Sequence, residues 1–404
     1  MRSHCKLLIL LLFILAMALA GPPSFAARMV PVAETRAMVA SVHQLASRAG
    51  VQMMKAGGNA VDAAVATGFA LAVVHPQAGN LGGGGFMLIR FADGKTHFVD
   101  YREKAPAAAT TTMYLDAQGN VIEDASIIGY KAIGVPGSVA GMVYAEKKYG
   151  KLSLARVMAP AIKLAEEGFA LAAEDAGDLQ DDKPLGQFPE SRRIFQRDGN
   201  YYKAGEVLKQ PDLARTLKRI AGNPDDFYHG DMARELAASL QKGGGLITIG
   251  DLAHYEVKER EAVRGSYRGY EIISAPPPSS GGTTLIEILN ILEGYDLAKF
   301  GGRSAQAIHL TLEAFRRAFF QKWLGAVVQA REPLKIFATL THEQRVADFR
   351  RLDERVMLAN RLSLVASLTQ EVQRRLQAPE AAAARPGRRP GLVRPRGPRR
   401  PRRT

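Results

Sequence analysis

Residues 57–102 constrain the fold more than any other part of this 404-residue sequence. The segment begins with a run of small, helix-forming residues, continues through four consecutive glycines at 82–85, and ends in two apolar runs separated by an Asp-Gly pair. That pair between apolar runs predicts a β-hairpin over 86–91 and 96–101. Alanine and glycine side chains cannot fill a core alone, so another layer must approach the helix closely. The segment therefore predicts a β-hairpin packed on small-residue helices.

Capping and spacing patterns predict further elements along the chain. Ser41 is expected to cap a helix that ends at a Gly-Gly pair, and Asn59 is expected to open the next helix. Apolar residues at helical spacing predict another helix over 152–168. Farther along, residues 267–274 are predicted to form a strand, and a helix is expected to begin near Thr283.

The composition is that of a globular protein whose basic character is concentrated at one end. Hydrophobic residues make up 47% of the chain and charged residues 23%, enough for a substantial core. The net charge is +14, but nine of these charges come from the arginines of residues 385–404, a stretch without acidic residues. Interspersed prolines predict that residues 381–404 form a disordered tail. Nonspecific binding to acidic lipid or nucleic acid would explain this tail, but we favour a changed reading frame in a GC-rich gene and expect no specific nucleic-acid partner.

Residues 1–26 have the pattern of a secretory signal peptide. Arg2 and Lys6 precede an apolar run that is too short to span a bilayer comfortably. Cleavage after Ala20 and cleavage after Ala26 both fit, and an uncleaved N-terminal anchor is the alternative. Cleavage would remove Cys5, the single cysteine, and would leave no disulfide or thiolate metal site. We therefore expect an exported protein, periplasmic or extracellular, with no stable membrane anchor after the signal is removed.

Several segments, in order, closely resemble the γ-glutamyltransferase family. The motifs that carry the resemblance are the glycine run at 82–85, Asp-Tyr-Arg-Glu-Lys-Ala-Pro at 100–106, Gly-Val-Pro-Gly at 134–137 and Pro-Pro-Pro-Ser-Ser-Gly-Gly at 276–282. Residues 35–320 resemble the family's large subunit, whereas residues 321–380 form a predicted helical segment that does not follow its pattern. The resemblance implies an α+β fold, the αββα sandwich of N-terminal-nucleophile hydrolases, here incomplete because the small-subunit half is absent.

Arg102 is the residue that we assign to substrate binding. It follows a predicted strand at a proline-containing turn, where side chains commonly point into a cleft. A guanidinium can hold a carboxylate through two parallel hydrogen bonds. Judged by residue type alone, a surface ion pair with Asp100 or Glu103 would explain Arg102 better. The resemblance favours substrate, because it implies that this arginine binds the α-carboxylate of a γ-glutamyl group.

No catalytic residue is predicted in this chain. The resemblance implies a threonine nucleophile at the head of a Thr-Thr-His segment, and no such segment follows. Thr341 is a poor candidate, because it forms a capping-box pattern with Gln344 ahead of apolar residues at helical spacing. Ser279 and Ser280 lack a nucleophile elbow and are expected to form a turn with N-capping hydroxyls. The glycine run lacks the Gly-Lys-Ser/Thr ending of a phosphate loop, so neither a cofactor nor a metal is expected.

The resemblance implies a γ-glutamyltransferase, or glutathione hydrolase, that transfers a γ-glutamyl group from glutathione to water or an amino acid. A separate small subunit is the implied partner, and the chain alone is expected to be inactive because the nucleophile is missing. A cephalosporin acylase of the same superfamily, which would bind glutaryl amides, is the enzymatic alternative. A non-enzymatic binding protein with a basic tail is the other.

Overall fold

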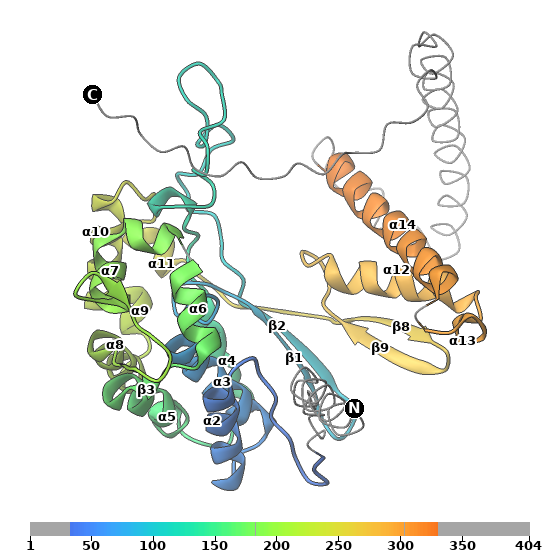
Figure 1. Cartoon of the computed structure of the whole chain (residues 1–404), viewed down its shortest axis with the longest axis horizontal. Coiled ribbons are helices and arrows are strands. Elements are labelled where there is room, and N and C mark those ends of the chain that lie inside the picture. Colours follow the sequence, from blue (N-terminus) through green and yellow to red (C-terminus); the bar gives the residue numbers. More distant parts are fainter. Residues whose placement is uncertain (1–32, 182, 303, 330–404) are drawn as a thin grey trace, which may run out of the picture. The chain divides into compact units, whose positions relative to one another are not determined.

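The computed structural model describes residues 33–181, 183–302 and 304–329 (Figure 1). The predicted signal peptide, most of the predicted helical segment 321–380, Thr341 and the Arg/Pro-rich tail lie outside these residues. The chain divides into two units between Phe319 and Phe320, and the long helix α14 (Ala305–Gln329) crosses that boundary. Each helix in the described residues is too short or too polar to cross a bilayer.

Two helices, α2 (Gln44–Lys55) and α3 (Ala60–Val74), pack against each other at the start of the described chain. Asn59 caps α3 as predicted, because its side-chain oxygen accepts hydrogen bonds from the first-turn amides. The prediction that Ser41 caps α2 is wrong. His43 is the cap, with its Nδ1 accepting from the Leu45 amide at 3.1 Å, whereas the Ser41 hydroxyl donates to the His43 carbonyl.

The predicted β-hairpin is confirmed. Strands β1 (Phe86–Arg90) and β2 (Thr96–Asp100) pair antiparallel, with Leu88 opposite Phe98, and β7 (Lys258–Arg260) adds to the other edge of β2. Successive side chains alternate between the two faces of a strand. Ile89 and Val99 accordingly belong to the main core, whereas Leu88 is exposed. The hairpin thus has one covered face and one face with an exposed apolar side chain.

Most of the remaining helices share the core of α2 and α3. The predicted helix over 152–168 is α5 (Leu154–Glu167), whose Val157, Ala161 and Ala165 are buried at helical spacing. α5 packs on α3, and α4 contacts β2 (Figure 1). The other elements of this part are α4 (Ser138–Tyr149), α6 (Ala173–Asp181), α7 (Pro189–Phe195), α8 (Pro211–Gly222), α9 (Asp226–His229), α10 (Asp231–Lys242) and α11 (Ile249–Ala253), with the 3-10 turns η1 (Tyr130–Ala132) and η2 (Lys183–Gln187) and the short strands β3 (Phe169–Ala170), β4 (Gln196–Arg197), β5 (Asn200–Tyr201) and β6 (Val207–Leu208).

Residues 263–319, which we call the C-terminal segment, begin with a second hairpin. β8 (Val263–Tyr267) and β9 (Tyr270–Ser274) pair antiparallel through a turn at Arg268-Gly269, whose φ values are 49° and 82°. The predicted single strand over 267–274 is therefore only partly right, because Tyr267 ends β8 and the turn precedes β9. The hairpin is followed by α12 (Gly281–Glu293), α13 (Leu297–Phe300) and α14. Helices and antiparallel sheets together make an α+β fold, as predicted.

Candidate functional site

Arg102 follows β2 directly, and the backbone on each side of it is paired. Tyr101 exchanges both backbone hydrogen bonds with Gly85, at N···O distances of 3.0 and 3.3 Å. Lys104 exchanges both with Val135, at 3.2 and 2.8 Å. The glycine run and the Gly-Val-Pro-Gly turn, which are far apart in the sequence, therefore meet at the segment that carries Arg102.

Glycine is required where these three backbones touch. A Cβ on Gly84 would lie 2.6 Å from the Glu103 nitrogen, and a Cβ on Gly137 would lie 2.0 Å from the Tyr101 oxygen. The Gly137 amide, at the start of α4, donates to the Gly83 carbonyl at 2.7 Å. This amide thus binds protein rather than an anion.

The backbone of Arg102 itself is held by two side chains. Its amide donates to Oδ1 of Asp100 at 3.1 Å, and its carbonyl accepts from the Tyr255 hydroxyl at 2.9 Å. Asp100 is only 7% exposed, and its Oδ2 accepts from Nε of Arg260 at 2.7 Å. The Arg102 guanidinium is exposed and makes no hydrogen bond or ion pair with any residue in the described ranges, Glu103 included. The surface ion pair that residue type suggested is therefore not formed.

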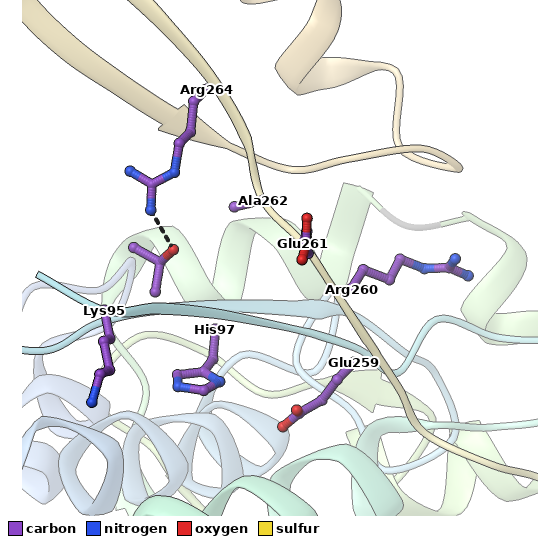
Figure 2. Close-up of a pocket in the computed structure, with 8 residues that line it drawn as sticks. Lys95, His97, Glu259, Arg260, Glu261, Ala262 and Arg264 are labelled. Carbon is purple, nitrogen blue, oxygen red and sulfur yellow. Dashed lines mark hydrogen bonds between the residues drawn. The ribbon is translucent and has the colours of Figure 1, made fainter. Parts of the chain in front are cut away.

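A cavity of about 640 Å³ opens beside β2 and β7 (Figure 2). It is lined by Lys95, Thr96, His97, Glu259, Arg260, Glu261, Ala262 and Arg264. Arg102 is not part of this lining. Figure 2 shows a hydrogen bond across the cavity, in which the Arg264 guanidinium donates to the Thr96 hydroxyl at 2.8 Å. Arg264 also pairs with Glu271, Arg260 with Asp100 and Lys95 with Asp93, so all three lysine and arginine side chains of the lining already have carboxylate partners.

The polar groups on the β2 side of this cavity are also satisfied within the protein. Tyr149 donates its hydroxyl to Glu259 and contacts Nδ1 of His97 at 2.9 Å. Lys148 pairs with the same Glu259 oxygen at 2.9 Å. Burial, together with the Glu259 carboxylate, raises the pKa of Tyr149 to about 12, so its hydroxyl stays protonated. This arrangement cross-links α4 to β2 and β7, and we assign no substrate to it.

The two serines at the start of α12 behave as turn residues. Ser279 accepts a hydrogen bond from the Gly281 amide at 3.3 Å, and the Ser280 carbonyl accepts from the Thr283 hydroxyl. Ser280 is the N-cap, yet its side chain makes no capping hydrogen bond. The expectation of two N-capping hydroxyls is therefore wrong for Ser280, because its backbone already has helical dihedral angles.

The sequence predicted Arg102 as a site residue but gave no signal for the groups that hold it. Tyr255 is separated from Arg102 by 153 positions, and its sequence neighbourhood carries no motif that connects the two. Asp100 was expected only as an alternative ion-pair partner. A signal for the close-approach glycines was present, because two glycine-containing motifs, at 82–85 and 134–137, lie on either side of the Arg102 segment in the sequence.

Comparison with known proteins places the chain in a family. A family model described as Gamma-glutamyltranspeptidase matches residues 46–390. The chain is 49% identical over 319 residues to the glutathione hydrolase proenzyme of Pseudomonas sp. (strain A14), covering 76% of this chain and 55% of that protein. It is also 42% identical over 303 residues to the acylase ACY 1 proenzyme of Pseudomonas sp. (strain SE83), covering 72% and 53% respectively.

Solved structures agree. The crystal structure of Helicobacter pylori γ-glutamyltranspeptidase superimposes with a TM-score of 0.70 at 47% identity, covering 72% of this chain and 84% of that chain. The predicted fold is thereby confirmed, and the described residues form part of it. The chain spans about half the length of the curated relatives it matches. The family match runs past residue 320, where the motif order was expected to stop, so a boundary there stays a prediction.

Proposed function

Because the chain belongs to the Gamma-glutamyltranspeptidase family, we propose that it forms the substrate-carboxylate half of a glutathione hydrolase. The observation that carries this proposal is Arg102, an exposed guanidinium without a partner in the described residues, mounted on a backbone that is hydrogen-bonded on both sides. An unpaired cation on a fixed backbone is a ready receptor for a carboxylate.

The proposed chemistry divides between two parts of the enzyme. Arg102 receives the two α-carboxylate oxygens of a γ-glutamyl compound such as glutathione, which directs the γ-amide toward the reacting centre. There a threonine hydroxyl from the small-subunit part attacks the γ-carbonyl carbon, and the amine departs with a proton. Water or an amino acid then takes the γ-glutamyl group from the threonine ester. The oxyanion donors also come from the small-subunit part.

The proposals on location, on the partner subunit and on the reading frame rest on the sequence. We propose that residues 1–26 direct export to the periplasm or the extracellular space, and that a small-subunit part carrying the nucleophile completes the site. A change of reading frame near codon 320 would explain why the Thr-Thr-His segment is missing. Reading the encoding DNA in all frames around that codon tests this, and a frame without a Thr-Thr-His segment would count against it.

An acylase is the second candidate, and the 42% identity to the acylase ACY 1 proenzyme is the observation that favours it. A glutaryl group is a γ-glutamyl group without its α-amine, so Arg102 fits the carboxylate of either. The group that accepts the α-ammonium therefore decides between them. Competition between γ-glutamyl and glutaryl amides for the reconstituted enzyme separates the two activities.

Binding to the chain alone tests the proposal without any turnover. We expect the purified protein to bind L-glutamate in an NMR titration and to release no product from a γ-glutamyl anilide. Arg102→Ala should weaken the binding about tenfold or more, the loss expected of a charge-assisted hydrogen bond. Arg90→Ala, which changes an exposed arginine of β1, should leave it unchanged. Equal binding by Arg102→Ala and the unmodified chain would refute the assignment of Arg102.

A further inference from the structure

We infer that Tyr255 is a positioning residue for Arg102: its hydroxyl holds the Arg102 carbonyl and so fixes the direction in which the guanidinium leaves the backbone. The inference rests on the proposed carboxylate-binding role of Arg102. The contact is a 2.9 Å hydrogen bond that joins the segment after α11 to the segment after β2. Together with the Asp100 bond to the amide, it secures Arg102 on both sides.

The Tyr255 ring is itself held in place. It stacks on Tyr228 with ring centres 5.7 Å apart and planes at 21°, and the Lys104 ammonium lies 5.0 Å from its centre. Tyr228 donates to the Pro136 carbonyl and accepts from the Ala140 amide, which ties the stack to the start of α4. Burial raises the pKa of Tyr255, so the hydroxyl keeps its proton and remains a donor. A rigid donor of this kind orients its acceptor more closely than a flexible one.

The hydroxyl reaches Arg102 only because Gly137 has no side chain. A Cβ at that position would lie 2.1 Å from the Tyr255 oxygen. The glycine therefore admits both the Tyr101 backbone and the Tyr255 hydroxyl to the same place. An exposed arginine whose backbone is fixed loses less conformational freedom when it binds, which favours carboxylate recognition.

Tyr255→Phe tests this inference, because it keeps the ring stack and removes the bond to Arg102. We expect the affinity of the purified chain for L-glutamate to fall about fivefold, the loss typical of one hydrogen bond. The affinity for the α-amide of glutamate, in which an amide replaces the α-carboxylate proposed to bind Arg102, should not change. General destabilisation would weaken both ligands, so the ratio of the two affinities isolates positioning. Tyr149→Phe, which removes a hydroxyl bonded elsewhere, is the matched control.

Hydrogen exchange provides the second measurement, and it needs no ligand. Tyr255→Phe should speed amide exchange in residues 100–106, whereas Tyr149→Phe should not. If amide exchange in residues 100–106 is unchanged in Tyr255→Phe, the inference is overturned. It is also overturned if exchange is faster but the variant keeps the same ratio of affinities for glutamate and its α-amide. If Arg102→Ala binds glutamate normally, or the unmodified chain shows no preference for glutamate over the amide, the proposed function fails instead. The exchange result then still decides whether Tyr255 holds Arg102.

Discussion

The described residues of 33–262, which we call the body and which carry Arg102, bury a larger share of their large apolar side chains than the C-terminal segment does. In the body, large side chains such as Phe69, Phe98 and Leu217 are almost completely buried. In the C-terminal segment, the buried cluster has four members, two of them alanines: Ile288, Leu292, Ala314 and Ala318. Other large apolar side chains of the same segment remain 43–62% exposed, namely Leu285, Ile308, Leu312 and Phe315.

This difference separates the region around Arg102, where the proposed site lies, from a surface that the described residues leave uncovered. Around Arg102, close backbone contacts and side-chain hydrogen bonds fix the geometry within the chain itself. On α14, Ile308, Leu312 and Phe315 recur at helical spacing and form a stripe, which we call the α14 stripe. Contiguous apolar surface of this kind is typical of a face that another chain or segment covers. We therefore expect the body to be stable by itself and the C-terminal segment to depend on a partner layer.

Gly137→Ala should have the largest effect on the stability of the body. The new Cβ would lie 2.0 Å from the Tyr101 oxygen and 2.1 Å from the Tyr255 oxygen, so β2, α4 and the Tyr255 loop must separate. Overpacking typically costs about 1 to 3 kcal/mol, and we expect the upper end here because the clash involves the backbone. Urea unfolding measures this loss. Gly177→Ala in α6, where a Cβ meets nothing within 4 Å, is the control and should stabilise slightly.

Arg102→Lys tests the chemistry of the proposed carboxylate site. One ammonium cannot reproduce the two-pronged contact of a guanidinium with a carboxylate. When a complementary small subunit restores activity, the variant should lose about 1.5 to 3 kcal/mol of transition-state stabilisation, measured as kcat/KM for a γ-glutamyl anilide. Stability should not change, since the side chain has no partner among residues 33–329 that the structure describes. Arg90→Lys in the same hairpin is the control, and an equal loss there would refute a specific role for Arg102.

Much of the body could be predicted from the sequence because its signals are local. Asn59 caps α3, small residues mark α3 as a close-packed helix, and an Asp-Gly pair marks the hairpin. One error, at the start of α2, arose where two signals competed. A serine and a histidine both precede α2, and the imidazole took the cap that Ser41 was expected to form. The Tyr255 contact could not be predicted, because it depends on the packing of elements distant in sequence.

A buried carboxyl pair gives the body a predicted pH dependence. Asp62 and Glu146 are 0% and 3% exposed. Burial opposes ionisation of Asp62, but amide donors from Asn59, Leu152 and Lys151 outweigh it and lower its pKa. Burial raises the pKa of Glu146 to about 8, and the neighbouring Asp62 carboxylate adds to the shift. Glu146 is therefore protonated at neutral pH, and its neutral carboxyl can donate to Asp62.

The sign of the pH effect follows from proton binding. Between the ordinary pKa of 4.5 and the folded value of about 8, the folded protein holds a proton on Glu146 that the unfolded chain releases. Stability from this group is complete below pH 4.5 and is lost as pH rises toward 8. In Glu146→Gln the amide still donates but does not titrate, so the variant should gain about 1 to 2 kcal/mol relative to the unmodified chain between pH 5.5 and 8. Urea unfolding at both pH values measures this, and parallel pH dependences would contradict it.

Substitution in the α14 stripe should have the smallest effect on stability. Leu312 is 62% exposed, so Leu312→Gln removes little packing and should change the free energy of unfolding by no more than about 0.5 kcal/mol. It should reduce the binding of a hydrophobic dye, because it interrupts the exposed stripe. Leu292→Gln is the matched control, since Leu292 is only 6% exposed and an amide buried there loses its hydration. Two results would show that the stripe is covered within this chain, and the contrast between the two regions would then fail. One is that Leu312→Gln destabilises as strongly as Leu292→Gln. The other is that the unmodified chain binds no dye and unfolds cooperatively.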